Sequence, residues 1–309
     1  MKIFEKYNLL SQPSSNKMLI EAVKINDFLA VEYLLTSKNM LNPANINYID
    51  HSGSSALSYA IYNRNLDMVK FLIEEPSLKT HSNINQCDYD DEYNMLLTSI
   101  CIKNYEITKY FLLDPQFKNK IDIHYQAKHG ENALMLACRN GDLEIVKLLI
   151  EEDINTENSR LLDKSYKNDM NAFLWACRSN NLEVVKYLVN ISNYDFIHQK
   201  DDDGNTALFH AYYRNCSETI DYLIKELKFD IYEKNKDNKN IFHIAYKKKE
   251  EQWISDLLIK YDFIIDTDTQ NWMEDNKDYF TYEVVKSISQ QKKLNSILDN
   301  KHSQKIHKI

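Results

Sequence analysis

Five cysteines and nine histidines are the residues of this chain whose side chains could act as nucleophiles, bases or metal ligands. The cysteines are Cys87, Cys101, Cys138, Cys177 and Cys216, an odd set without a C-x-x-C pair, which argues against a disulfide framework. The sequence has no H-E-x-x-H motif, no cysteine cluster with zinc spacing and no two histidines at i, i+4. We therefore expect no catalytic residue, no metal site and no cofactor, and an enzyme is the least favoured class of function.

The run Asp201-Asp-Asp-Gly204 carries carboxylates like those of a calcium loop, but it lacks the alternate ligands and the closing Glu of such a loop. The run is more typical of a hairpin tip. Glycine occurs only at Gly53, Gly130, Gly141 and Gly204, so neither a phosphate-binding loop nor a dinucleotide fingerprint can be written. Function must then depend on a surface.

A short motif that occurs seven times must form the elements that carry this surface. Each copy has an apolar start centred on Ala, followed by a segment such as Leu-Glu-Val-Val-Lys-Tyr-Leu. The copies begin at the anchor residues Lys17, Ser55, Asn94, Asn132, Asn171, Thr206 and Asn240. The apolar spacing predicts a first helix of about eight residues after each anchor and an amphipathic second helix beyond it. Because one unit cannot bury its apolar face alone, the copies are expected to stack.

This motif resembles the ankyrin repeat, and the resemblance covers residues 16–260. The family signature T-P-L-H-x-A appears as Thr206-Ala-Leu-Phe-His-Ala211, and the finger pattern D-x-x-G-x-T appears in the residues just before it. The family Pro is Ala in four copies, and the family His survives only as His243. The resemblance implies an all-α fold, in which stacked helix-turn-helix units form a solenoid and hairpin or loop fingers join them.

The repeats also predict the parts of the chain. We assign residues 1–15 to an N-terminal extension, 16–264 to the solenoid, and 265–309 to a helical cap with a basic tail. One or two helices within residues 278–298 are expected to cover the core of the last repeat. Six lysines lie from Lys286 onward with only Asp299 as an acidic residue. A solvated tail is the favoured interpretation, and a contact with nucleic acid, a membrane or a sorting factor is the alternative.

Two local features of the repeats carry further expectations. The turn between the two helices falls at Asn26, Arg64, Lys103, Gly141, Asn180, Asn215 and Lys249. Because such turns need positive φ, we expect a modestly strained or altered turn where Arg or Lys stands. The first four connections exceed the family period of about 33 residues, with extra residues in 74–82, 114–120 and 151–158 after helices stopped near Pro76 and Pro115. A longer outer turn is the favoured interpretation, and a second recognition edge on the convex side is the alternative.

The resemblance further implies where a partner binds, because ankyrin repeats hold partners with finger tips and with the exposed residues after the Ala pair of the first helix. The residues transferred onto this concave face are Tyr62, Tyr93, Ile102, Lys128, Arg139, Lys167, Arg178, Tyr213, Arg214, Lys247 and Lys248. Over repeats four to seven, the face carries nine basic and four acidic residues on a chain of net charge −8. This basic stripe favours an acidic peptide or protein surface.

Arginine makes the expectation more specific. The resemblance places Arg139, Arg178 and Arg214 on the predicted concave face, and the chain has only five arginines. Arginine is enriched at binding hot spots, because its planar guanidinium pairs with carboxylates and stacks on aromatic rings. The alternative is that basic residues at these positions serve solubility alone.

We expect a non-catalytic protein–protein interaction scaffold that is a monomer and binds a partner protein or peptide on the concave face. The alternative is a targeting adaptor, in which the repeats hold cargo and the C-terminal segment docks on a ligase, a membrane or nucleic acid. Neither a small-molecule substrate nor nucleic acid is expected at the repeats. No apolar run reaches the roughly 18 residues of a membrane helix, and residues 1–16 lack the apolar core of a signal peptide. We therefore expect a cytoplasmic protein.

Overall fold

The computed structural model describes residues 14–37, 43–87, 92–117, 120–154, 161–162, 169–192, 194–276, 278 and 281–293. The chain divides into two compact units, residues 1–199 and residues 200–309, and each is described by itself. The described residues form helices and turns, apart from one isolated antiparallel bridge between Ile49 and Ser55. The predicted all-α class is therefore confirmed. The predicted limits of the solenoid, residues 16 and 264, remain a prediction.

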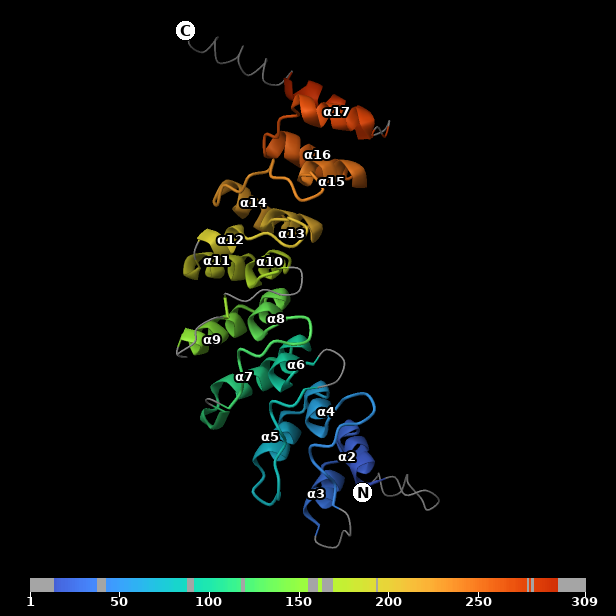
Figure 1. The fold of residues 1–309 in the computed structure, drawn as a ribbon, viewed down its shortest axis with the longest axis vertical. Coiled ribbons are helices and arrows are strands. Elements are labelled where there is room, and N and C mark those ends of the chain that lie inside the picture. The colour runs from blue at the N-terminus through green and yellow to red at the C-terminus, as the bar shows by residue number, and fades with distance from the viewer. Residues whose placement is uncertain are drawn as a thin grey trace, which may run out of the picture. The chain divides into compact units, whose positions relative to one another are not determined.

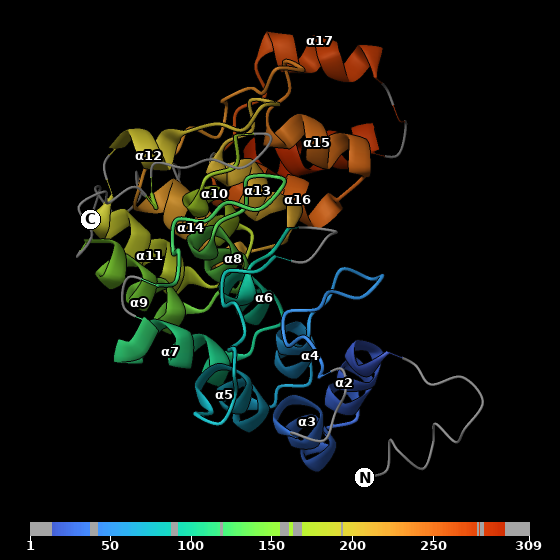
Figure 2. The same ribbon diagram turned by 60° about the horizontal axis from the view of Figure 1, so that its bottom comes forward.

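The first unit is built from helix pairs, each a first helix, a tight turn and a second helix (Figure 1). The pairs are α2 (Ser15–Lys24) with α3 (Phe28–Thr36), α4 (Ala56–Tyr62) with α5 (Leu66–Glu74), α6 (Met95–Cys101) with α7 (Tyr105–Leu113), α8 (Ala133–Asn140) with α9 (Leu143–Ile154), and α10 (Ala172–Cys177) with α11 (Leu182–Ile191). The short helices η1 (Pro115–Phe117) and α12 (Tyr194–His198) lie in connections. Figures 1 and 2 show α6, α8 and α10 in one row and α7, α9 and α11 in a second row beside it.

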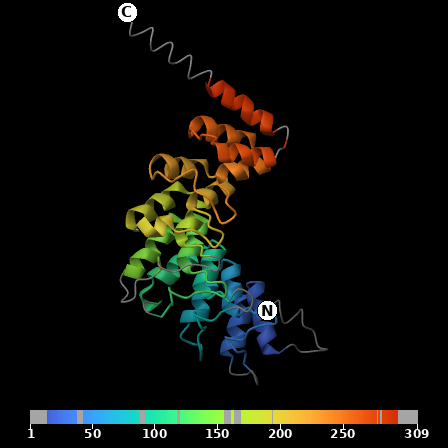
Figure 3. The same ribbon diagram turned by 45° about the horizontal axis from the view of Figure 1, so that its top comes forward.

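The second unit continues the pattern with α13 (Ala207–Tyr213) and α14 (Ser217–Lys225), then α15 (Ile241–Lys248) and α16 (Glu251–Ser255). A π-helical turn, η2 (Asp256–Lys260), extends α16. Two further helices follow, α17 (Thr267–Asp275) and a helix over residues 281–293, and they are the red helices of Figure 3. Trp272 of α17 packs edge-on against His243 of α15, with ring centroids 4.4 Å apart.

The anchor residues are the N-caps of the first helices. Five anchor side chains accept a hydrogen bond from the backbone N–H three residues later: Ser55, Asn94, Asn132, Asn171 and Asn240. Such a cap stabilises a helix by about 1 kcal/mol. Thr206 is also an N-cap, but its side chain does not accept this bond. The first copy differs, because α2 begins at Ser15 and Lys17 therefore lies inside the helix.

The turn residues all adopt the same left-handed conformation. Their φ angles lie between 55° and 72°, at Asn26, Arg64, Lys103, Gly141, Asn180, Asn215 and Lys249. The Arg and Lys turns are therefore strained as expected, because a residue with a Cβ atom pays a steric cost there, but they are not altered. Gly141 has a second reason for its identity, since an added Cβ atom would lie 3.0 Å from Cβ of Asn181.

Four finger tips in the described parts of the chain form hairpin turns with a shared pattern of hydrogen bonds. In the sixth finger, the Asp201 N–H donates to the Asn205 carbonyl, and the Gly204 N–H donates to the Asp201 carbonyl. The equivalent bonds close the tips that begin at Asp50, Ala127 and Asn235. The run Asp201–Gly204 is thus a hairpin tip, as predicted.

The longer outer turns begin where the prolines predict. Helix α5 ends at Glu74, before Pro76, and α7 ends at Leu113, before Pro115. Helix α9 continues to Ile154, and the rest of the third insertion lies outside the described residues. In the parts of the chain that the structure describes, we find no helix with the length and apolar character needed to cross a membrane.

Candidate functional site

Arg139, Trp175 and Arg178 form a cluster at the C-terminal ends of α8 and α10. The guanidinium carbon of Arg139 lies 5.7 Å from the centroid of the Trp175 ring, and that of Arg178 lies 5.2 Å from the same centroid. Both distances are within the range of a cation–π contact, in which the ring quadrupole attracts the cation. One aromatic ring therefore holds two of the three arginines that the sequence singled out.

The position of Trp175 itself was not predicted as part of the site. It stands four residues after its anchor and directly before the Ala of the first helix, where the pattern suggests a core residue. Its side chain is only partly buried. A large aromatic at this position, as at Tyr59 in the second repeat, is the sequence signal that could have identified it.

A buried carboxylate orients Arg139 from the other side. Nη1 of Arg139 lies 3.1 Å from Oε1 of Glu131, and the Tyr93 hydroxyl donates to Oε2 of Glu131. The Arg139 side chain is 33% exposed, whereas that of Glu131 is 9% exposed. The guanidinium is thus held in place on two sides and still reaches the surface.

Tyr93 differs from the expectation that its ring is exposed. It is only 7% exposed, because its hydroxyl reaches Glu131 of the next finger. Burial and the hydrogen bond to Glu131 raise the pKa of Tyr93 well above its ordinary value, so the phenol stays neutral. The described geometry gives Tyr93 the role of positioning Glu131.

The other predicted residues of the first unit are separate from this cluster. Tyr62 is 42% exposed and lies edge-on to Tyr59, with 6.3 Å between ring centroids. Ile102 is partly exposed at the C-cap of α6, and its carbonyl accepts a hydrogen bond from Arg64. Lys128 is exposed on its finger. Lys167 lies outside the described residues.

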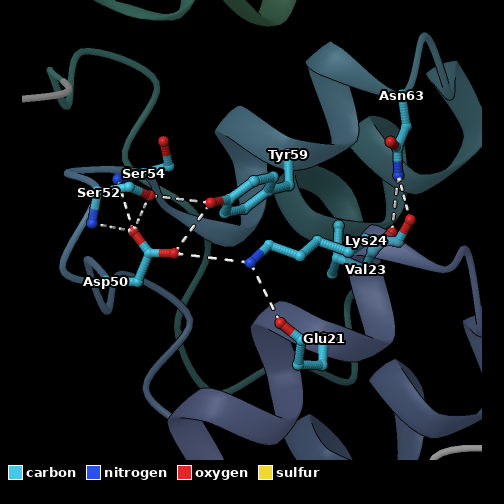
Figure 4. Close-up of polar contacts among 8 residues, drawn as sticks. All are labelled: Glu21, Val23, Lys24, Asp50, Ser52, Ser54, Tyr59 and Asn63. Atoms are coloured by element: carbon cyan, nitrogen blue, oxygen red, sulfur yellow. Dashed lines mark hydrogen bonds and ion pairs between the residues drawn. The ribbon is translucent and has the colours of Figure 1, made fainter.

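A second cation and ring meet where the first two repeats stack (Figure 4). Nζ of Lys24 lies 4.5 Å from the centroid of Tyr59 and 3.1 Å from Oε1 of Glu21. The Tyr59 hydroxyl donates to Asp50 over 2.9 Å. Burial alone would raise the pKa of Asp50, but hydrogen bonds from Ser52, Ser54 and Tyr59 outweigh it and hold the pKa below its usual value. This network fixes the finger against the first helices, and neither Lys24 nor Tyr59 was predicted as a site residue.

The second unit also places cations over aromatic rings. Nζ of Lys248 lies 5.0 Å from the Tyr213 ring and 5.3 Å from the Tyr212 ring. Nζ of Lys247 lies 6.0 Å from the ring of Trp272. Arg214 is exposed, and its guanidinium makes no hydrogen bond or ion pair with a described residue. The structure therefore brings Tyr213 and Lys248 together and adds Trp272, which the sequence did not indicate.

The side chains of Cys138, Cys177 and His210 could act as nucleophiles, bases or metal ligands, but they are packed as structural residues. Cys138 and Cys177 are fully buried between helices, as predicted from their equivalent positions, and burial raises the pKa of the Cys138 thiol. Nε2 of His210 lies 3.0 Å from Oδ2 of Asp201, and both side chains are buried at the base of the finger. Among the residues with described positions, no group of three or more His, Cys, Asp or Glu side chains is arranged to bind a metal ion.

Comparison with known proteins identifies the family of this chain. The family model for ankyrin repeats, which represents three copies of the repeat, matches residues 4–86, 76–159, 95–200 and 158–235. These matches cover well over half of the chain, and the chain belongs to the ankyrin-repeat family. The seventh copy lies beyond residue 235 but has the same N-cap and left-handed turn, at Asn240 and Lys249. Ankyrin repeats suggest a function in protein–protein interaction.

The search of curated proteins finds no significant match to the chain. Among solved structures, one similar chain belongs to the complex of the Bd0816 predatory endopeptidase of Bdellovibrio bacteriovorus with the immunity protein Bd3460. The two chains are 20% identical with a TM-score of 0.54, and the alignment covers 70% of this chain and 100% of that one. At this level of identity, the similarity establishes a shared fold.

Proposed function

We propose that the protein is a non-catalytic scaffold that binds a partner protein or peptide with the first-helix face, the surface that the C-terminal ends of the first helices and the finger tips form within each unit. The cluster of Arg139, Trp175 and Arg178 is the observation that carries this proposal. Tryptophan and arginine are the residue types most enriched at binding hot spots. Because the ring and Glu131 already order Arg139, less conformational entropy is lost when a partner binds.

The partner that this face suits carries an acidic surface or segment. Arginine presents five N–H donors in a planar fork, and Arg139 uses Nη1 for Glu131 while staying partly exposed. Lys128 adds an exposed positive charge in the first unit. In the second unit, Tyr213, Arg214, Lys247 and Lys248 supply the same combination of cations and aromatic rings. Carboxylates of a partner would be attracted to these groups and would pair with them.

One comparison supports a protein partner. The similar solved structure is a complex between two proteins, which is consistent with a protein partner here. The adaptor alternative depends on the C-terminal segment, residues 265–309, of which residues 294–309 lie outside the described residues, so it stays a prediction.

The proposal is tested by affinity capture from the source cell with the wild type, with Arg139→Ala/Arg178→Ala/Arg214→Ala, and with a control, Lys70→Ala/Lys147→Ala/Lys186→Ala. Both triple variants remove three positive charges, but the lysines lie on the second helices α5, α9 and α11. We expect the arginine variant to lose the captured partner while its far-ultraviolet circular dichroism stays unchanged, and the lysine variant to retain it. Capture of the same proteins at the same level by all three would refute the site.

A further inference from the structure

A cavity of ≈ 390 Å³ opens at the C-terminal end of α7, in the row of second helices. Its volume is within the range of small binding pockets. The walls are largely apolar and include Phe111, Leu113, Phe117, Ile121 and Ile123. Because the arginine cluster belongs to the first helices α8 and α10, this cavity is a different feature from the first-helix face.

The longer third connection builds the cavity. Helix α7 stops before Pro115, and η1 then folds Phe117 back against the helix. The Phe117 ring packs edge-on against Tyr110, 5.0 Å between centroids, and against Phe111, 5.8 Å between centroids. Phe117 is only 4% exposed, so it is a fixed part of the wall. The described part of the extra residues, 114–117 and 120, therefore packs against α7 beside a hollow, which a minimal outer turn would not need.

An apolar side chain is left exposed at the mouth of this cavity. Leu113, the last residue of α7, is 53% exposed. An exposed leucine that borders a hollow with buried aromatic walls provides apolar surface for an incoming side chain.

Three carboxylates, here called the acidic rim, also line the cavity. They are Asp114, Asp122 and Glu152, and no lysine or arginine among the described residues forms an ion pair with any of them. A fourth lining residue, His124, is paired with Asp153 at 3.4 Å. The lining thus combines three carboxylates with apolar side chains, and the carboxylates would attract and orient a cationic partner.

We propose that this cavity is a second docking site, which takes a partner segment with a large apolar side chain flanked by lysine or arginine. The apolar side chain enters between Leu113 and Phe117, and the basic residues pair with the carboxylates of the rim. The chemistry is opposite to that of the first-helix face, so the two surfaces bind different segments. The second site gives a function to the longer outer turn that follows α7.

The test uses short random peptides displayed on phage and selected on the immobilised full chain. Enriched peptides are synthesised and titrated by fluorescence anisotropy against the wild type, Leu113→Lys and Ile259→Lys. Ile259 is a matched control, because it is 58% exposed at the end of a second helix in the other unit. A further variant, Asp122→Asn/Glu152→Gln, removes rim charge with little change of shape.

We expect a class of peptides with an apolar residue beside lysine or arginine. Its dissociation constant should rise roughly tenfold with Leu113→Lys and severalfold with Asp122→Asn/Glu152→Gln, but should not change with Ile259→Lys or with the arginine variant of the first-helix face. The proposal is overturned if no peptide class is enriched, if every enriched peptide binds Leu113→Lys as tightly as the wild type, or if the peptides that lose binding carry no basic residue.

Discussion

Arg139 lies over the ring of Trp175, so a cation of the fourth repeat rests on an aromatic side chain of the fifth. Lys24 and Tyr59 repeat this relationship between the first and second repeats. In both pairs, the cation stands seven residues after its anchor and the ring stands four residues after the next anchor. The contact is therefore a consequence of the register in which repeats stack, and its chemistry changes with the residues at these two positions.

Trp175→Leu removes the ring that orders both arginines while keeping an apolar side chain at the position. Without the ring, each arginine must be immobilised when the partner binds, at a cost of about 0.5–1 kcal/mol per side chain, so we expect partner affinity to fall roughly fivefold to thirtyfold. The measurement is a titration of the captured partner, with Tyr187→Leu as the control, because the Tyr187 ring has Lys147 over it on second helices. Equal affinities for wild type and Trp175→Leu would show that the ring is irrelevant to binding.

Tyr93→Phe removes the hydroxyl that donates to Glu131. The change should destabilise the first unit by about 1 kcal/mol, because a largely buried carboxylate loses one of its two partners. Urea unfolding followed by circular dichroism measures it, with Tyr213→Phe as the control for removal of a hydroxyl at a 42% exposed ring. If both substitutions have the same small effect, the hydroxyl of Tyr93 does not stabilise the stack.

His243 makes the stability of the second unit depend on pH. Burial and the charges of Lys234 and Lys239 lower the pKa of His243 to about 4, so the folded chain keeps the ring neutral. The unfolded chain takes up a proton below its ordinary pKa of about 6.5, so stability is full above that pH and is lost as the pH falls toward 4. We expect urea unfolding to show a loss of about 2 kcal/mol between pH 7 and pH 4.5 in the wild type, and a smaller loss in His243→Gln. His51→Gln, a substitution at an exposed histidine, is the control. If His243→Gln lost as much stability between pH 7 and pH 4.5 as the wild type, the pH dependence would not come from His243.

The left-handed turns predict opposite effects for two substitutions. Lys103 has φ of 55°, so Lys103→Gly should relieve strain and stabilise the chain by up to about 1 kcal/mol. Gly141→Ala should destabilise it by about 1 kcal/mol or more, because φ is 72° and the new Cβ atom would meet Asn181. Thermal unfolding compares the two. If the unfolding temperature of Lys103→Gly were lower than that of the wild type, the Lys103 side chain would stabilise the fold by more than the backbone strain destabilises it.

The sequence predicts the features that depend on the register of the repeat. The anchors, the left-handed turns and the buried Cys138 and Cys177 follow from it, because each is decided within one helix pair. Helix α17 does not, because it lacks the Ala-centred start by which the copies are recognised. Tyr93 is buried because its hydroxyl contacts Glu131 of the next repeat, and Trp175 contacts Arg139 of the preceding repeat. An alignment of the copies does not show such contacts between repeats.

The hollow beside α7 illustrates the same limit. An excess over the family period and a proline are visible in the sequence, and they predict the end of α7 and a longer turn. The packing of Phe117 against Tyr110 and Phe111 determines that this turn encloses a cavity. That packing depends on three-dimensional contacts between the turn and the helix.

The decisive measurement for the first-helix face is the dissociation constant of the captured partner for Arg139→Ala/Arg178→Ala. It is compared with the constants for the wild type and for Lys70→Ala/Lys147→Ala, which remove the same charge from the second helices. We expect the arginine pair to raise the constant roughly tenfold to a hundredfold and the lysine pair to change it by less than about threefold. An unchanged constant for the arginine pair, or an equal rise for both pairs, would contradict the assignment of the first-helix face as the binding site.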